Sequence, residues 1–572
     1  MMTATIDTDV LVIGSGGAGC RAALEAVQTG CDVTLVTKGL FGKSGTTAFR
    51  VADTAGYNFA DGIVDSEDNP DQHLADIRRA GKGMEYEELA GVLAADAVDT
   101  ATFLEKLGVS FEKDAATRRY IEVTGCFASR PRMHIMRDHG EQIIRAMVPV
   151  IKGLPIRIVE RTLIVDLIVN DGSCVGAVGI DAEGHPVVLR AKAVVLGCGG
   201  AGQLFKYTLT PKDITGDGYA LGLRAGAELV NMEFMQVVLG TLKPTKNQFN
   251  TFLWCARPRL LNAFGEQFLD NYLPGQVTAE QCMDAKSRHF PFSTCDHSRY
   301  IEIAVQKETL KSDQDDHAGV FIDLTGITDD VVAGLPPTSP LPKVWPIVKA
   351  YMKKRGFSID TEPVPVACFA HAINGGLKIN TDGQTTLPGL YAAGEVAGGP
   401  HGADRLGGNM LVTCQVYGAR AGRAAAKTAS EKGYAAFEQL QDAPILDRIQ
   451  FCKQQQGTLK VQQLTEHLQE TMWRNALVVR NKVKLETALS ELADLRCRMP
   501  QAKINSVNDL RSLIELGNLL DVGEAIITAA LHRTESRGSH YREDYPAQDP
   551  RWDKRILIGY RKGEIVKREE RS

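Results

Sequence analysis

The pattern of apolar and polar positions predicts that the chain begins with a buried parallel sheet. Residues 9–13 form a short apolar run, which suits a strand covered on both faces. A glycine-rich turn follows, and residues 20–28 have the small residues of a closely packed helix. Residues 33–36 form a second apolar run. The order of strand, turn, helix and strand therefore predicts the start of an α/β domain.

The turn between the first strand and the helix has the G-x-G-x-x-G spacing of a dinucleotide cradle. Its residues are Gly14, Ser15, Gly16, Gly17, Ala18 and Gly19. Gly14 allows the tight turn, Gly16 lets a pyrophosphate approach the backbone, and Gly19 lets the helix pack close to the strand. Phosphates then lie at the positive end of the helix. An ordinary glycine turn is the less favoured alternative, because the flanking elements follow in the required order.

The end of the second strand indicates which dinucleotide is bound. An NAD-binding domain normally has Asp or Glu here to hold the ribose, whereas this chain has Thr37 and Lys38. A hydroxyl can still hold a ribose, but the usual NAD signature is missing. We therefore expect FAD.

Later changes of pattern divide the chain. Residues 70–107 have helical periodicity, and residues 156–193 alternate in short runs separated by Asp-Gly and Glu-Gly turns, which predicts a β-meander. Residues 193–196 then form a buried strand of the first sheet. Residues 237–363 are richer in proline and aromatic residues, as in a lobe inserted over a ligand cleft, and residues 443–531 predict a helical bundle.

Composition excludes several classes of partner. The chain has 572 residues and a formal net charge of −5, which argues against nucleic-acid binding. It has no apolar stretch of membrane-spanning length, and residues 1–8 are too short and polar for a signal peptide, so we expect a cytoplasmic protein without direct membrane insertion. Its 12 cysteines include no C-x-x-C pair, so we expect no metal or cluster of its own.

The order of several characteristic segments resembles the flavoprotein subunit family of succinate dehydrogenase and fumarate reductase, which includes L-aspartate oxidase and adenylylsulfate reductase. The segments are residues 14–19, 44–46, 191–202, 215–218, 371–376, 389–395, 401–411 and 535–546. The resemblance implies an α/β fold with a Rossmann-like FAD-binding domain, an inserted α+β capping domain and a C-terminal helical domain. It also implies hydride transfer between flavin N5 and a carbon beside a carboxylate.

This resemblance assigns approximate domain boundaries. The FAD-binding domain takes residues 1–236 and 365–430, and the capping domain takes residues 237–364. The helical domain and tail take residues 431–572.

The resemblance also implies the residues that contact FAD. Besides the cradle, they are Thr37, Lys38, Ser44, Gly45, Thr46, Asp217, Glu395, Asn409, Met410 and Leu411. Many family members attach FAD covalently to a histidine after the serine that matches Ser44. Gly45 occupies that position here, so we expect FAD to be bound without a covalent link.

The expected catalytic residues are His371, Arg405 and Arg299. Arg405 resembles the arginine that clamps a substrate carboxylate near the flavin, and a planar guanidinium suits that task. His371 matches a second carboxylate contact, although a histidine at this spacing alone is more often a core residue. Arg299 matches the second arginine of the family motif R-D-x-x-A-R, whereas the first, proton-donating arginine has no counterpart.

Other departures from the family pattern concern the substrate. Val238 stands where dicarboxylate enzymes have a carboxylate-binding histidine, and Asn250 or Thr251 is nearest to their threonine. A valine cannot compensate a buried carboxylate. We therefore expect a small carboxylate substrate with one carboxylate near the reacting carbons and a less charged far end. Three residues could replace the missing proton donor, namely Arg257, Arg259 and His297.

Two functional classes follow from the sequence. The favoured one is a flavin-dependent reductase or dehydrogenase, with aspartate oxidase-like and adenylylsulfate reductase-like chemistry as alternatives. The other is an electron-transfer subunit with a decayed substrate pocket. In both cases we expect a separate redox partner, an iron–sulfur protein subunit, with direct use of oxygen as the main competitor.

Overall fold

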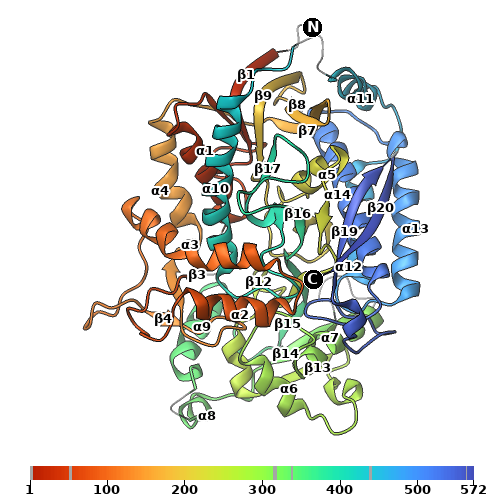
Figure 1. The fold of residues 1–572 in the computed structure, drawn as a ribbon. Helices are drawn as coiled ribbons and strands as arrows, with labels where there is room; N and C mark the ends of the chain where they lie inside the picture. The colour runs from red at the N-terminus through yellow and green to blue at the C-terminus, as the bar shows by residue number, and fades with distance from the viewer. Residues whose placement is uncertain are drawn as a thin grey trace.

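The computed structural model describes residues 4–49, 54–312, 319–336, 339–436, 441–561 and 563–571. Figure 1 shows a central region built on a large sheet, a lobe with α6, α7, β13 and β14 at the bottom, and the C-terminal helices at the right. The predicted fold class, an α/β FAD-binding fold with a C-terminal helical domain, is confirmed.

The central sheet has seven strands in the order β6-β2-β1-β9-β8-β7, with β17 also paired to β9. The strands are β1 (Ala4–Ile13), β2 (Val33–Val36), β6 (Ile156–Val159), β7 (Leu163–Asn170), β8 (Ser173–Ile180), β9 (Pro186–Leu196) and β17 (Leu390–Ala392). The pairs of β1 with β2 and β9, of β2 with β6 and of β9 with β17 are parallel, whereas β8 is antiparallel to β7 and β9.

The predicted meander is present as β7, β8 and β9. One detail differs, because the strand expected at residues 193–196 is the second half of the single strand β9. The first half of β9 pairs with β8, and Val194 to Leu196 pair with β17. Hence β9 joins the meander to the parallel sheet without a break.

Helices pack closely on this sheet. The central helices are α1 (Gly17–Val27), α4 (Glu141–Lys152), α5 (Asp217–Arg224) and α10 (Asn409–Glu431). Helices α1 and α10 contact each other along their length and lie side by side in Figure 1. A Cβ atom on Gly422 of α10 would lie 2.4 Å from the Ala22 carbonyl oxygen, so this close approach requires glycine.

A smaller unit lies between β2 and β6 in the chain. It contains α2 (Pro70–Gly81), α3 (Glu87–Lys106) and a three-stranded sheet in the order β3-β5-β4. The strands are β3 (Thr54–Asn58), β4 (Glu122–Val123) and β5 (Met133–Arg137). The two helices agree with the helical pattern predicted for residues 70–107.

The capping lobe is built on a five-stranded sheet with the order β12-β11-β15-β14-β13. Its elements are β11 (Met235–Thr241), β12 (Asn247–Gln248), β13 (Arg259–Asn262), β14 (Val320–Asp323), β15 (Val364–Ile373), α6 (Ala279–Lys286), α7 (Arg299–Lys311), α8 (Asp329–Ala333) and α9 (Leu341–Lys354). The boundaries predicted after residues 236 and 364 fall inside β11 and β15, which pair with each other. Two adjacent strands therefore connect the lobe to the central region.

The described C-terminal residues form a group of helices, as the sequence predicts, and a hairpin that the sequence analysis did not predict. The helices are α11 (Ala443–Lys453), α12 (Val461–Ala476), α13 (Lys482–Arg498) and α14 (Val507–His532). The hairpin strands β19 (Lys554–Arg561) and β20 (Glu564–Arg571) extend a sheet with β10 (Leu229–Val230), β16 (Gly376–Lys378) and β18 (Ala397–Gly398). The end of the chain is thereby tied to the central region.

Candidate active site

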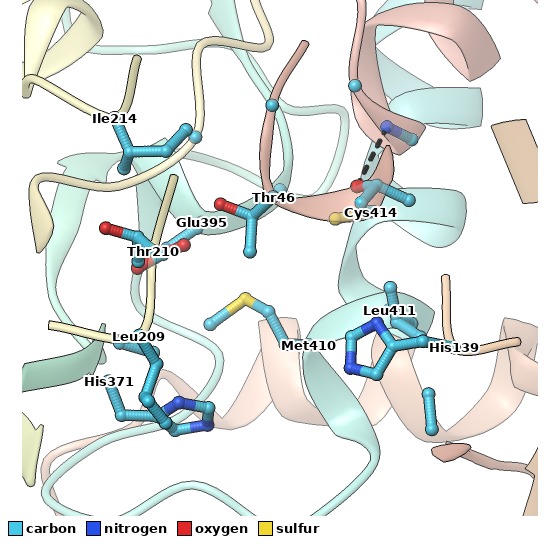
Figure 2. Close-up of a pocket in the computed structure, with 18 of the residues that line it drawn as sticks. Thr46, His139, Leu209, Thr210, Ile214, His371, Glu395, Met410, Leu411 and Cys414 are labelled. Carbon is cyan, nitrogen blue, oxygen red and sulfur yellow. Dashed lines mark hydrogen bonds between the residues drawn. The ribbon is translucent and has the colours of Figure 1, made fainter. Parts of the chain in front are cut away.

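A cavity of about 720 Å³ lies between the central region and the capping lobe. Its wall includes the glycine turn before α1, the ends of β2 and β15, the start of α10 and several capping segments. Figure 2 shows side chains from these distant segments around one space, with Thr46 and Glu395 in the upper part of the view and Met410 and His371 below them. The cavity brings most of the predicted site residues together.

The glycine turn has the close contacts that the sequence predicts. Gly14 has a φ of +105°, and a Cβ atom there would lie 2.4 Å from the Gly197 carbonyl oxygen. A Cβ atom on Gly19 would lie 1.8 Å from the carbonyl oxygen of Gly14, so α1 can start against the turn only with glycine there. Gly14, Ser15, Gly16, Gly17 and Ala18 line the cavity, whereas Gly19 packs behind them.

The end of β2 contributes a hydroxyl and a paired lysine. Ser15 Oγ donates to Thr37 Oγ1 at 3.0 Å, and both residues line the cavity. Lys38 Nζ lies 2.7 Å from an Asp217 carboxylate oxygen and 2.8 Å from one of Glu515 in α14. Burial opposes the charge of Lys38, but the two carboxylates outweigh it and raise the lysine pKa. This ion cluster joins the cavity wall to the C-terminal helices.

Gly45 lies beside the glycine turn on the cavity wall. Its φ is +88°, and its backbone N–H donates to Asp213 Oδ2 at 2.8 Å. A Cβ atom on Gly45 would have its nearest neighbour at 4.0 Å, the Cα of Gly16. Ser44 and Thr46 line the same wall. The loop thus leaves open space beside the cradle, and its backbone conformation favours glycine.

Glu395 places a carboxyl group inside the cavity. Its Oε1 accepts a hydrogen bond from the Ile373 backbone N–H at 3.1 Å. Burial raises the pKa of Glu395 to about 7, although this hydrogen bond and the charge of Arg405 act in the opposite direction. A Cβ atom on Gly200 would lie 2.2 Å from the same carboxyl, so the glycine makes room for it. The Glu395 carboxyl can therefore accept hydrogen bonds from the hydroxyl groups of a ligand in the cavity.

These features fit a flavin adenine dinucleotide. The glycine turn offers a backbone surface that any side chain would block, and it stands at the positive end of α1. Thr37 offers a hydroxyl where a ribose lies in related folds, and Glu395 offers a buried acceptor. The residues that would hold the cofactor are therefore present on one continuous wall.

Arg405 and His371 both line this cavity. Arg405 is buried, and its guanidinium donates from Nε to Gln236 Oε1 at 3.0 Å and from Nη1 to the Leu406 carbonyl at 2.8 Å. Its Nη2 has no hydrogen bond to a described residue. Burial lowers the pKa of His371 to about 3, and the charge of Arg405 adds to this effect. The pair thus combines one cation with a neutral imidazole.

Several predicted residues lie elsewhere. Arg299 is outside the lining of this cavity and donates to the Thr294 carbonyl and the Tyr300 hydroxyl, so its position gives no support to a catalytic role. Asn409 also lies outside the lining, and its Oδ1 contacts Asn58 Nδ2 at 2.7 Å. Its neighbours Met410 and Leu411 do line the cavity.

The residues proposed to replace the missing proton donor are also remote. Arg257 pairs with Glu280, Arg259 pairs with Asp323, and His297 stacks beside Tyr300. None of Arg257, Arg259 and His297 lines the cavity.

Arg288 and His139 are among the cavity-wall residues that the sequence analysis did not identify. Arg288, in the turn after α6, is exposed and is the charged side chain among the described capping residues that line the cavity. His139, after β5, points into it beside Met410 and Leu411 in Figure 2. Neither residue lies in a periodic segment. The Asp-His-Gly sequence around His139 is a local turn signal that could have marked this residue. In the structure, His139 has a positive φ of 55°.

The described residues contain no helix long and apolar enough to span a membrane.

Comparison with known proteins places these features in a family. Residues 9–411 match the model of an FAD binding domain, and residues 465–570 match that of the fumarate reductase flavoprotein C-terminus. One subunit of the fumarate reductase (CoM/CoB) from Methanothermobacter marburgensis is 32% identical over 96% of this chain and 97% of its own. An L-aspartate oxidase from a Nostoc strain is 30% identical over 96% and 93%. The structure of Mycobacterium smegmatis Sdh1 superposes with a TM-score of 0.84 at 28% identity, over 100% of this chain and 95% of its own.

Proposed function

The chain belongs to the succinate dehydrogenase and fumarate reductase flavoprotein family and is an FAD-dependent oxidoreductase, and from this premise we propose that it acts on an unsaturated or saturated monocarboxylate. When bound, FAD supplies the hydride acceptor or donor for the carbon beside the carboxylate. The substrate and the direction of the reaction are the parts that this proposal adds to the family assignment.

The observation that carries the proposal is the position of Arg405 on the same cavity wall as the glycine cradle. Gln236 and the Leu406 carbonyl hold the guanidinium in place, and Nη2 remains for a ligand. A buried cation of this kind favours an anion, and a planar fork matches a carboxylate. Neutral His371 beside it can donate one N–H to the same group.

A single carboxylate is favoured over two. Val238, at the position of the family's carboxylate-binding histidine, is fully buried within β11 and lies outside the cavity lining. Thr251 Oγ1 donates its proton to the Lys286 carbonyl, and Asn250 Oδ1 accepts from the Phe252 N–H. This arrangement argues against fumarate, succinate and aspartate as the preferred substrates.

Arg288 is the proposed proton donor. The family motif begins with its proton-donating arginine at the position where this chain has Thr294. Arg288 lies on the capping wall of the cavity, across from the FAD-binding domain. Its guanidinium would donate the proton that the substrate takes up together with the hydride, from the capping side of the substrate.

FAD is proposed to bind without a covalent link, and the electrons to pass through a separate protein. Gly45 replaces the histidine that forms the link in many family members. Several relatives are named as subunits of fumarate reductases, which supports a partner chain. Among the 12 free cysteines of this chain no C-x-x-C pair could hold a cluster. An iron–sulfur protein is the proposed partner.

An anaerobic flavin titration tests the proposal. The purified holoprotein is reduced chemically, a panel of enoates is added, and reoxidation of the flavin is followed by absorbance. We expect monocarboxylic enoates to reoxidise the flavin faster than fumarate, and Arg405→Ala to slow the reaction about a hundredfold while FAD content is retained. A flavin that reacts with no enoate, but still exchanges electrons with viologen, would instead support the electron-transfer subunit.

A further inference from the structure

The cavity continues beyond the cofactor cradle into an arm formed by the capping lobe. The apolar arm, as we name it, is lined by Phe249, Phe252, Leu253, Phe290, Val344, Ile347, Val348, Tyr351 and Met352. All of these residues come from the capping lobe, whereas the cradle is formed by the FAD-binding domain. The arm therefore offers space that the cradle residues do not surround.

One side of the arm is a face of helix α9. Its cavity-lining residues are Val344, Ile347, Val348, Tyr351 and Met352, which recur at the three- and four-residue spacing of a single helix face. Ile347 is 64% exposed although it is a large apolar side chain. An apolar face that lines a cavity and remains uncovered there is suited to an apolar ligand.

The opposite side is aromatic. Phe249 is nearly fully buried and contacts Trp254 with 5.5 Å between ring centroids, and Phe252 follows it in the 3₁₀ segment that packs on α9. Phe290 meets His371 edge to face, with 6.0 Å between the ring centroids. The apolar arm thus begins beside the proposed carboxylate anchor.

Two of the polar side chains near the arm are already paired. Asn247 Nδ2 donates to the Tyr351 hydroxyl at 3.1 Å, and Thr241 Oγ1 donates to the Thr245 carbonyl at 2.9 Å. Arg288 is the charged capping residue on this wall, but it is exposed and stays hydrated. A second carboxylate placed in the arm would therefore lose water without gaining a buried cation among the described arm residues.

From this geometry we propose that the substrate carries an extended apolar substituent, alkyl or aryl, which lies in the arm while its carboxylate contacts Arg405. This inference rests on the proposed function, because the carboxylate anchor fixes which end of the substrate enters the arm. It adds a substrate class, namely monocarboxylates with a hydrophobic tail.

Binding to the holoprotein tests the tail separately from the chemistry. Saturated, unreactive carboxylates of increasing chain length are titrated by calorimetry and by perturbation of the flavin absorbance. We expect affinity to rise about fourfold for each added methylene, the factor that corresponds to about 0.8 kcal/mol per buried CH₂. Affinity that is independent of chain length would overturn the proposal.

A pair of variants locates the effect. Ile347→Glu places a charge on the arm at a position exposed enough to tolerate it, so we expect it to remove the chain-length dependence and to leave binding of the shortest acid unchanged. Val483→Glu is a matched change at a 72% exposed residue of α13, and it should alter neither the chain-length dependence nor the affinity for the shortest acid. Equal losses for short and long acids in Ile347→Glu would indicate general damage and refute the assignment.

A parallel series of alcohols separates this inference from the proposed function. In one outcome, the alcohols bind as tightly as the acids, their affinity rises with chain length, and Ile347→Glu removes this rise. That result would support the apolar arm and refute the carboxylate anchor. Short acids that depend on Arg405 but show no gain with length would keep the proposed function and refute the arm. Tighter binding of dicarboxylates than of monocarboxylates with an apolar tail would also overturn the proposed substrate class.

Discussion

Arg405 and Gln236 form a reciprocal pair in which each residue holds the other. Arg405 Nε donates to Gln236 Oε1 at 3.0 Å, and Gln236 Nε2 donates to the Arg405 backbone carbonyl at 3.1 Å. Gln236 belongs to β11, one of the two strands that enter the capping lobe, and Arg405 precedes α10. The orientation of the guanidinium therefore depends on both parts of the fold.

Replacement of Arg405 should remove the substrate anchor without removing the cofactor. A charge-assisted hydrogen bond in a buried cleft contributes about 2–3 kcal/mol, so we expect Arg405→Ala to lower kcat/KM by about a hundredfold. Arg405→Lys should also be impaired, because a point charge cannot replace the planar fork. Steady-state kinetics with FAD occupancy checked by absorbance provide the measurement, and wild-type turnover in Arg405→Ala would refute the anchor.

Gln236 should behave as a positioning residue. Gln236→Leu removes one bond to the guanidinium and should raise KM with a loss of about tenfold in kcat/KM. Gln236→Glu keeps the shape but adds a carboxylate that pairs with Arg405 and competes with the substrate, so we expect a larger loss. A purely structural role predicts the reverse order, with the isosteric Glu variant the milder of the two.

Much of this site could be predicted from sequence because its signals are local. The cradle at Gly14 and the strand-ending Thr37 lie in one continuous stretch, and hydrophobic periodicity identifies the elements around them. The partnership of Arg405 with Gln236 joins residues 169 positions apart, and no local pattern encodes it. Arg288 lies in an irregular turn, where only the fold brings it to the cavity.

The hairpin β19–β20 was missed for a related reason. Its strands are rich in charged residues, and β20 is mostly exposed, so its sequence resembles a polar tail. The apolar residues that define it, Ile556 to Ile558, are buried against a short strand from the middle of the chain. Pairing across such a distance depends on the tertiary structure.

Glu395 should make the stability of the cofactor-free protein depend on pH. Burial raises its pKa from 4.5 to about 7, so the folded state binds a proton that the unfolded state has released between these values. The stabilisation is fully present below pH 4.5 and is lost as the pH rises through 7. The shift corresponds to at most about 3 kcal/mol in the free energy of unfolding, and water in the cavity reduces this value.

Thermal denaturation between pH 5 and pH 8 measures this effect. Asp404, whose pKa burial also raises to about 7, should contribute in the same direction. We therefore expect Glu395→Gln to reduce the decline in stability with rising pH and not to remove it fully. An unchanged pH profile in Glu395→Gln would show that the carboxyl titrates normally in the fold.

The flavin should leave the denatured protein. Gly45 offers no side-chain nitrogen at the position of the family's linking histidine, so acid precipitation should release all of the yellow colour into the supernatant. Absorbance of the supernatant and fluorescence of the washed pellet give the measurement. Flavin retained by the pellet after denaturation would mean that another residue forms a covalent link.

The reduced flavin should depend on a separate electron donor or acceptor. The glycine cradle is the nucleotide fingerprint found in the sequence and is assigned to FAD, which leaves no predicted site for a nicotinamide. The chain alone should therefore reduce enoates with reduced viologen and show little activity with NADH. An added iron–sulfur protein, if co-purified from the native source, should restore turnover with a physiological donor. Rapid turnover with NADH alone, or fast peroxide formation in air without another acceptor, would count against a dedicated partner, because either reaction would recycle the flavin within this chain.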